Sequence, residues 1–312
     1  MKMNEAIEVE VLLATFNGAR YIAEFLDSLI AQEGVRIHLR ISDDGSTDET
    51  LVICRNYQDK LSSLKIETGP KAGPAANFYS LLRSAELQYI AFADQDDIWL
   101  PNHLRDSIRR LQKSGEKPAL TFAAVNEFAT NSPKSSKIWP PRFPTEDIRE
   151  ILTWNPARGC TIVLNKKAAR IINDQEPKLS LMHDWWALLS IFTTGEVTWS
   201  VAPEIKYRLH DSNTVGVPSS KSKRLSNWLG NLRSPDWPLL EQAQELLDVH
   251  GENMPLAMRA NLQTWCLRLS SKSIMDKFRL FLYSGRYRGT LLDEAMVRLT
   301  FLLLPIRRLI KP

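Results

Sequence analysis

Residues 89–101 read YIAFADQDDIWLP, and this stretch decides the fold that we expect. Its first five residues are apolar and predict a buried strand that ends where the carboxylates begin. A strand ending in this way delivers acidic side chains to the carboxyl edge of a sheet, where open α/β folds bind ligands. Asp94 and Asp96 stand two residues apart, so both side chains can face one divalent cation and hold it through oxygen. A short D-x-D is also typical of a solvated turn, and the surrounding sequence distinguishes the two.

The segments before this stretch alternate between strand and helix patterns. An apolar run over residues 9–16 predicts a buried strand, and the following Asn-Gly pair turns the chain. Helical spacing of apolar residues predicts a helix over 22–30, and alternation over 35–41 predicts a second strand. These patterns indicate an α/β fold with a mostly parallel central sheet flanked by helices. Residues 15–20 read TFNGAR, without G-x-G-x-x-G, which argues against a dinucleotide-binding domain, and there is no Walker A loop.

Several motifs in a fixed order carry a resemblance to a known family. They are LATFNG at 13–18, DDGSTD at 43–48, FADQDDIWLP at 92–101, RGCT at 158–161, HDWW at 183–186 and YRLHDSNTVG at 207–216. Over residues 8–210 the chain resembles a family 2 glycosyltransferase with the GT-A fold, and more narrowly the bacterial rhamnosyltransferases of that family. The resemblance implies inverting, metal-dependent transfer of L-rhamnose from dTDP-L-rhamnose to a bacterial cell-surface polysaccharide intermediate. The acceptor would then be a glycan or a lipid-linked glycan.

The resemblance also assigns residues to the nucleotide-sugar donor and its metal. Asp94 and Asp96 would hold Mg²⁺ or Mn²⁺ against the diphosphate, and the cation would stabilise the departing group. Asp97 would lie behind this pair or at the acceptor. The donor-binding residues that the resemblance implies are Thr15, Asn17, Asp43, Asp44, Asn77, Asp94, Gln95, Arg208 and His210.

Asp184 is the general base that we expect. It precedes an apolar run, so it lies at the start of a helix that faces the cleft. Aromatic neighbours raise the pKa of a carboxyl by desolvating it, whereas a helix N-terminus lowers that pKa. An Asp at this place is also typical of a helix cap, but the catalytic acid of the family falls here. Trp185 and Trp186 are assigned to the acceptor sugar, although paired indoles are common in cores as well.

Departures from the family pattern leave other functions open. Pro74 stiffens the donor loop GPKAGPAANF at 69–78, and Leu209 with Asp211-Ser212 replaces residues that are usually more polar or glycine. A UDP-hexose is therefore the alternative donor. A catalytically silent module that binds sugar nucleotides or glycans is an alternative of another class, and a membrane-associated scaffold is a third. Hydrolysis of a donor by the purified protein would distinguish the enzyme from both.

Composition is consistent with a cytoplasmic enzyme. Of the 312 residues, 44% are hydrophobic and 24% are charged, which excludes a disordered chain. Three widely separated cysteines fit neither a disulfide framework nor a C-x-x-C metal site. We find no signal peptide, no apolar run long enough to span a bilayer and no nucleic-acid-binding motif, so nucleic acid is not an expected partner.

The positive charge of the chain is concentrated near its C-terminus. Residues 221–312 hold 15 Lys and Arg against 8 Asp and Glu. We expect a catalytic domain over 1–217 and a helical, basic C-terminal extension over 218–312, because Pro, Ser and Lys interrupt the pattern near residue 217. Two interpretations of this extension stay open. It either packs on the catalytic domain, or its residues 272–312 attach to the cytoplasmic face of the inner membrane through cations interleaved with apolar side chains.

Overall fold

The computed structural model describes residues 6–129, 132–174, 177–178, 182–210, 226 and 239–303. The chain divides into two compact units. Unit 1 comprises Met1–Pro140 and Ala157–Leu209, and unit 2 comprises Pro141–Pro156 and His210–Pro312. The expected boundary at residue 217 falls outside the described residues and stays a proposal. The division adds that residues 141–156 group with the C-terminal unit, although they stand in the middle of the chain.

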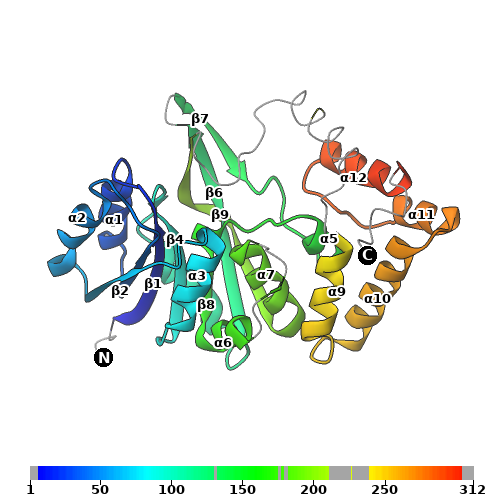
Figure 1. Cartoon of the computed structure of the whole chain (residues 1–312), viewed down its shortest axis with the longest axis horizontal. Helices are drawn as coiled ribbons and strands as arrows, with labels where there is room; N and C mark the ends of the chain where they lie inside the picture. The colour runs from blue at the N-terminus through cyan, green and yellow to red at the C-terminus, as the bar shows by residue number, and fades with distance from the viewer. Residues whose placement is uncertain are drawn as a thin grey trace. The chain divides into compact units, whose positions relative to one another are not determined.

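Unit 1 is built on one nine-stranded sheet in the order β3-β2-β1-β4-β8-β6-β9-β5, with β7 paired to β6 (Figure 1). Four strands form its parallel half: β1 Ile7–Thr15, β2 Val35–Asp43, β3 Ser63–Thr68 and β4 Tyr89–Asp94. Because β1, β2 and β4 are parallel, their carboxyl ends meet at one edge. The predicted strands after which the motifs stand are thereby confirmed.

The other half of the sheet is mixed. Its strands are β5 Ile98–Trp99, β6 Ala119–Ala129, β7 Ser132–Trp139, β8 Val163–Asn165 and β9 Glu196–Leu209. The short β8 is antiparallel to both β4 and β6, whereas β6 and β9 are parallel. The α/β fold with a mostly parallel sheet is as predicted, and β8 is the point at which the strand direction reverses.

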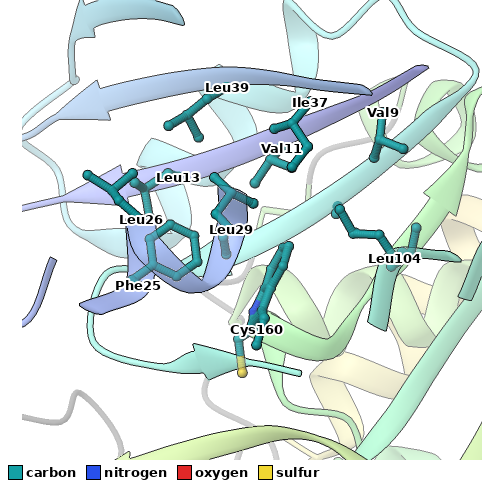
Figure 2. Packing of buried hydrophobic residues seen from close by; sticks show 14 of the residues in the cluster. Val9, Val11, Leu13, Phe25, Leu26, Leu29, Ile37, Leu39, Leu104 and Cys160 are labelled. Carbon is teal, nitrogen blue, oxygen red and sulfur yellow. The ribbon is translucent and has the colours of Figure 1, made fainter. Parts of the chain in front are cut away.

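Helices cover both faces of the sheet. The helices of unit 1 are α1 Ile22–Ile30, α2 Thr50–Arg55, α3 Pro74–Arg83, α4 His103–Gln112, α6 Lys166–Asp174 and α7 His183–Thr194, with short 3-10 turns at Gln58–Lys60 and Gly159–Thr161. Val11 and Leu13 pack with Phe25 of α1 in one buried cluster (Figure 2). On β4, Phe92 points the other way and contacts Phe78 of α3 and His183 of α7. Burial on both faces explains why these strands are continuously apolar.

A buried ion network joins α4 to β9 inside unit 1. Arg110 donates from Nη1 to Glu204 Oε1 at 2.6 Å and from Nη2 to Oε2 at 2.9 Å. His103 Nδ1 lies 3.0 Å from Glu204 Oε2. Burial raises the pKa of Glu204, but the hydrogen bonds from His103 and Arg110 outweigh it and lower that pKa to about 2. This carboxylate is therefore fully compensated.

Unit 2 is helical. Its helices are α5 Ile148–Thr153, α9 Leu239–His250, α10 Leu256–Ser270, α11 Ile274–Phe281 and α12 Leu291–Leu303. Its core contains Trp265 stacked near Tyr287, which in turn meets Phe301 edge to face. The predicted helical C-terminal region is thus confirmed over residues 239–303. Within the described part of the chain, every helix is too short or too polar to cross a bilayer.

Candidate active site

Two turns at the carboxyl edge of the sheet are tied together by side chains. They are residues 15–19 after β1 and residues 43–48 after β2. Thr15 Oγ1 donates to Asp43 Oδ1 at 2.8 Å, and Asn17 N donates to Ser46 Oγ at 2.9 Å. Thr47 N donates to Asn17 Oδ1 at 2.9 Å. Three of the predicted donor residues, Thr15, Asn17 and Asp43, are therefore brought together.

Asp43 uses its oxygens within the chain. Its Oδ2 accepts from Gly45 N at 3.0 Å and Ser46 N at 2.8 Å, and its Oδ1 accepts from Thr15 and from Ser46 Oγ. Burial raises the pKa of Asp43, but these hydrogen bonds outweigh it and lower the pKa overall. A carboxylate offers about four acceptor positions, so Asp43 shapes the turn, and its contact with a nucleotide base stays a prediction. The neighbouring Asp44 accepts from Lys71 N at 3.1 Å.

Gln95 and Asn77 hold the backbone around the same edge. Gln95 pairs with Phe16 as a strand would, since Phe16 N donates to its Oε1 at 3.1 Å and its Nε2 donates to Phe16 O at 3.0 Å. Gly18 lies beneath this amide, and a Cβ there would stand 2.2 Å from Gln95 Oε1. Asn77, buried on α3, donates from Nδ2 to Ser42 O at 2.9 Å. Both predicted donor residues lie at the edge, where they position the turns.

Pro74 is the first residue of α3 and follows Gly73, whose φ is 89°. A proline is favoured at this position because the first helical N–H has no partner within the helix. The predicted stiffness of the donor loop is therefore the ordinary start of a helix.

Buried acidic groups collect where β4 ends. Asp94, Asp97 and Cys160 each offer a ligand atom, and these atoms lie within 4.8 Å of one another. Burial raises the pKa of Asp94 well above its usual range, and the charges of Asp97, Asp96 and Asp184 raise it further. Burial and the charge of Asp96 likewise raise the pKa of Asp97 to about 7. Carboxylates that repel one another in this way would be stabilised by a cation.

The donor atoms of this cluster fit a divalent metal. Asp97 Oδ2 is buried and has no hydrogen-bond partner among the described residues, which leaves an acceptor available. Carboxylate oxygens suit Mg²⁺ and Mn²⁺. Burial and the charges of Asp97 and Asp94 raise the pKa of the Cys160 thiol well above its usual range, so the thiol stays protonated and the carboxylates are the ligands that fit. The prediction named Asp94 with Asp96, whereas the geometry groups Asp94 with Asp97 and Cys160. Asp96 acts on both carboxyls through its charge, and its role as a ligand stays a prediction.

Asp184 lies in the first turn of α7, next to this acidic cluster. Burial raises its pKa to about 6, although the Trp185 N–H and the charge of Arg158 oppose the shift. The preceding His183 stacks on Phe78 at 3.8 Å between ring centroids. Neither ring nitrogen of His183 has a hydrogen-bond partner in the described part of the chain, and burial lowers its pKa to about 3. The pair therefore consists of a neutral imidazole and a carboxyl that titrates near neutrality.

Gly159 allows the RGCT loop to pack against this pair. A Cβ on Gly159 would lie 3.1 Å from His183 Nε2 and 3.5 Å from Asp184 Cβ. The first distance is tighter than nearly all real Cβ contacts, so a side chain at residue 159 would push the pair away.

Arg158 brings a positive charge close to the carboxyl groups of the site, and the sequence did not identify this role. It donates from Nη2 to Glu127 Oε1 at 2.6 Å, and its guanidinium lies 4.5 Å from the centroid of Tyr207. Its charge lowers the pKa of Asp94, of Asp97 and of Asp184, against the effect of their burial. The motif RGCT was the only sequence signal for it.

Arg208 makes several hydrogen bonds to the acidic loop and to α1. Its N–H donates to Asp97 Oδ1 at 3.0 Å, its Nε to Asp96 O at 2.9 Å, and its Nη2 to Glu24 Oε2 at 2.7 Å. These contacts brace the acidic loop from β9, and the contact of Arg208 with a diphosphate stays a prediction. His210 belongs to unit 2, and its contact with the donor stays a prediction.

The predicted acceptor residues differ in exposure. Trp186 is fully buried in unit 1, and Asp97 is 1% exposed, so neither presents a surface to an acceptor in this structure. Tight packing of α7 against the sheet is the reason for Trp186. Trp185 is half-buried and keeps part of its indole accessible.

Comparisons with known proteins show the family of this chain. The model of the family described as glycosyl transferase family 2 matches residues 10–170. The dTDP-rhamnosyl transferase RfbG of Shigella flexneri is 32% identical over 235 residues, which cover 68% of this chain and 78% of that protein. The uncharacterized glycosyltransferase RP339 of Rickettsia prowazekii (strain Madrid E) is 24% identical and covers 72% of this chain and 71% of that protein.

A solved structure shares the fold. The crystal structure of S. aureus TarS 1–349 in complex with UDP-GlcNAc superposes with a TM-score of 0.57 at 17% identity, over 95% of this chain and 91% of that one. At this identity the likeness concerns the fold alone. With the family model covering more than half of the chain, this protein belongs to glycosyl transferase family 2 and has the GT-A fold.

Proposed function

We propose that this protein is an inverting, metal-dependent rhamnosyltransferase that moves L-rhamnose from dTDP-L-rhamnose to a bacterial cell-surface polysaccharide intermediate. The observation that carries the proposal is Asp184, a buried carboxyl whose pKa is raised to about 6, next to the acidic cluster at the carboxyl edge. A base with this pKa is largely ionised at neutral pH and still accepts a proton effectively.

The reaction is a single displacement at the anomeric carbon of the donor. The acceptor hydroxyl oxygen forms a bond to this carbon, the bond from the carbon to the diphosphate oxygen breaks, and Asp184 receives the hydroxyl proton. One displacement inverts the configuration at that carbon. Neutral His183 beside Asp184 adds no competing positive charge, and the absence of a side chain at Gly159 leaves room for both residues.

Asp94, with Asp96 and Asp97 beside it, would hold Mg²⁺ or Mn²⁺. When bound, the cation neutralises the charge that develops on the diphosphate. Arg158 and Arg208 prepare this place, since Arg158 moderates the repulsion among the carboxyls and Arg208 fixes Asp97 through its backbone N–H. Thr15, Asn17, Asp43, Asp44, Asn77 and Gln95 shape the pocket for the nucleotide.

RfbG, whose name states a dTDP-rhamnosyl transferase, supports the donor that we propose. The acceptor would be a glycan or a lipid-linked glycan, and Trp185 offers an indole face for its sugar. We place the enzyme in the cytoplasm at the inner face of the membrane, where lipid-linked intermediates are accessible. The helical region after residue 217 would attach it to that surface.

A thermal-shift comparison of dTDP and UDP with Mn²⁺ tests the donor. A ligand that binds the folded state at about 100 times its Kd adds about 2.7 kcal/mol of stability, so the preferred nucleotide raises Tm more. We expect dTDP to stabilise more than UDP, and dTDP-L-rhamnose to be hydrolysed slowly by the purified protein. A larger shift with UDP would replace rhamnose by a UDP-hexose donor. Donor binding without hydrolysis or transfer would instead indicate a silent binding module.

A further inference from the structure

Helix α11 turns an apolar face outward. Ile274, Met275, Phe278 and Leu282 recur at spacings that place them on one side of the helix, and they are 62%, 59%, 46% and 70% exposed. The opposite side is already buried, since Leu280 is 1% exposed within unit 2. A surface helix ordinarily shows the reverse arrangement, with its apolar stripe facing the core.

Helix α12 repeats this arrangement. Leu291, Leu292, Leu299 and Leu303 are exposed at one-sided spacing, whereas Val297 and Phe301 are buried on the other side. The two helices pack on each other within unit 2. We refer to the eight exposed side chains together as the outer apolar face: Ile274, Met275, Phe278, Leu282, Leu291, Leu292, Leu299 and Leu303. Exposed large apolar side chains on each of two helices that contact one another are typical of an interaction surface.

Charge points to the kind of surface that this face meets. From residue 255 onward the sequence holds 11 Lys and Arg against 3 Asp and Glu, so the partner is expected to be anionic. A second copy of this chain would bring the same positive charge to a symmetric contact. An anionic lipid surface offers both an apolar interior for the side chains and negative headgroups for the cations.

Much of the charge in these helices is already engaged. Lys277 is buried and donates to Leu269 O at 2.9 Å, and Arg279 pairs with Asp276 at 3.0 Å. Arg298 donates to Glu294 and to the carbonyls of three further residues. Lys272 stays exposed at the start of α11. Charge alone therefore gives a weaker attachment than the sequence predicts, and the apolar side chains have to supply most of it.

We propose that the outer apolar face inserts into the headgroup region of an anionic lipid monolayer, with α11 lying along the surface and the basic residues facing the phosphates. This inference rests on the membrane location given under the proposed function and names the surface that would provide it, and it does not depend on sugar transfer. It also differs from attachment by the basic tail, because insertion of aliphatic side chains resists salt whereas attraction between exposed charges is screened.

Co-sedimentation of the full chain with vesicles tests the proposal. We expect binding to phosphatidylcholine vesicles that contain about 30% phosphatidylglycerol, and most of it should persist at about 0.5 M NaCl. The double variant Phe278→Asp with Leu282→Asp should lower the partition coefficient by about tenfold or more. Val52→Asp is the matched control, because Val52 is an exposed apolar residue on a helix of unit 1 and should bind as wild type does.

A fluorescent label keeps the test decisive if the double variant folds poorly. The native cysteines Cys54, Cys160 and Cys266 are buried, so Leu282→Cys introduces an accessible thiol for an environment-sensitive maleimide. We expect its emission to shift to the blue when vesicles are added, and a label on Val52→Cys to remain unchanged. Absence of a shift at residue 282, or release of wild type by salt alone, would overturn insertion. A blue shift without vesicles, together with a dimer in light scattering, would assign the face to a second copy of this chain instead.

Discussion

Unit 1 buries two groups of carboxylates, and it treats them in opposite ways. Hydrogen bonds from His103 and Arg110 outweigh the burial of Glu204 and lower its pKa to about 2. At the carboxyl edge, burial raises the pKa of Asp97 to about 7 and that of Asp184 to about 6, because Arg158 compensates them only in part. The carboxylate that stabilises the fold is thus paired with cations of the chain. The negative charge of the carboxylates at the site is compensated only in part. A bound cation, or a proton taken up from a substrate, would stabilise these carboxyl groups.

Removal of divalent metal should have the largest effect on sugar transfer. With EDTA, transfer should be abolished, because the carboxyls of the acidic cluster would have no cation to set against the diphosphate. Excess Mn²⁺ should restore it. Asp96→Asn should weaken nucleotide binding only when metal is present, which calorimetry in the two buffers would show. Full activity in chelator would mean that Arg158 and Arg208 suffice for the leaving group.

Replacement of the base should give the next largest effect. Asp184→Asn keeps the shape of the side chain but cannot accept a proton, so transfer should fall by a factor on the order of 10² to 10⁴ while donor affinity is kept. Single-turnover kinetics and a donor titration separate the two quantities. Glu204→Gln is the control, since it also removes a buried carboxylate and should leave the rate per folded molecule unchanged. Normal transfer by the Asp184 variant would place the base elsewhere, with Asp97 and His183 as the next candidates.

Measurements of the free energy of unfolding should distinguish the paired Glu204 from the carboxylates of the site. Arg110→Met leaves Glu204 buried beside His103 alone, and we expect a loss of about 2–3 kcal/mol, discounted because both side chains keep some exposure. In metal-free buffer Asp97→Asn should not destabilise the protein, because an amide oxygen still accepts the Arg208 N–H while one repelling charge is gone. Urea unfolding of the two variants provides the comparison. Equal destabilisation would show that Asp97 is compensated as well as Glu204 is.

The response to pH should separate the two groups of carboxylates, because each group titrates in its own pH range. The pKa of Asp184 is raised to about 6, so below this pH the base is protonated and transfer should fall by about tenfold per pH unit. The pKa of Glu204 is lowered from 4.5 to about 2, so its contribution to stability is fully present above about pH 4.5 and is lost as the pH falls toward 2. Rate and Tm measured from pH 8 to pH 3 should therefore decline in different ranges. A simultaneous decline would mean that loss of activity reflects unfolding.

The sequence predicted the parts of this molecule whose cause is local. Apolar runs and turn residues identified β1, α1, β2 and the strand before Asp94, because each element is determined by its own periodicity. Contacts between distant segments were beyond its reach. Arg158 meets Glu127 from 31 positions away, and period-two spacing favoured Asp96 as the partner of Asp94, whereas the fold adds Asp97 and Cys160.

Direction is the second quantity that a pattern does not contain. The spacing of apolar residues around Phe278 indicates a helix, but it does not say which of these residues face the core and which face solvent. The same limit applies to Trp186, which is fully buried although the neighbouring Trp185 is only half-buried. Composition likewise does not indicate that residues 141–156 belong to unit 2.

The hydrogen bonds between the turns after β1 and β2 have a consequence for how a nucleotide is received. Thr15, Asn17 and Ser46 join these turns through hydrogen bonds within the chain. The conformational entropy of both turns is therefore lost when the chain folds, and binding has little further ordering to drive there. The nucleotide that we propose for this edge would meet turns that are already ordered, so its rate of association would be governed by diffusion and orientation rather than by rearrangement of the turns.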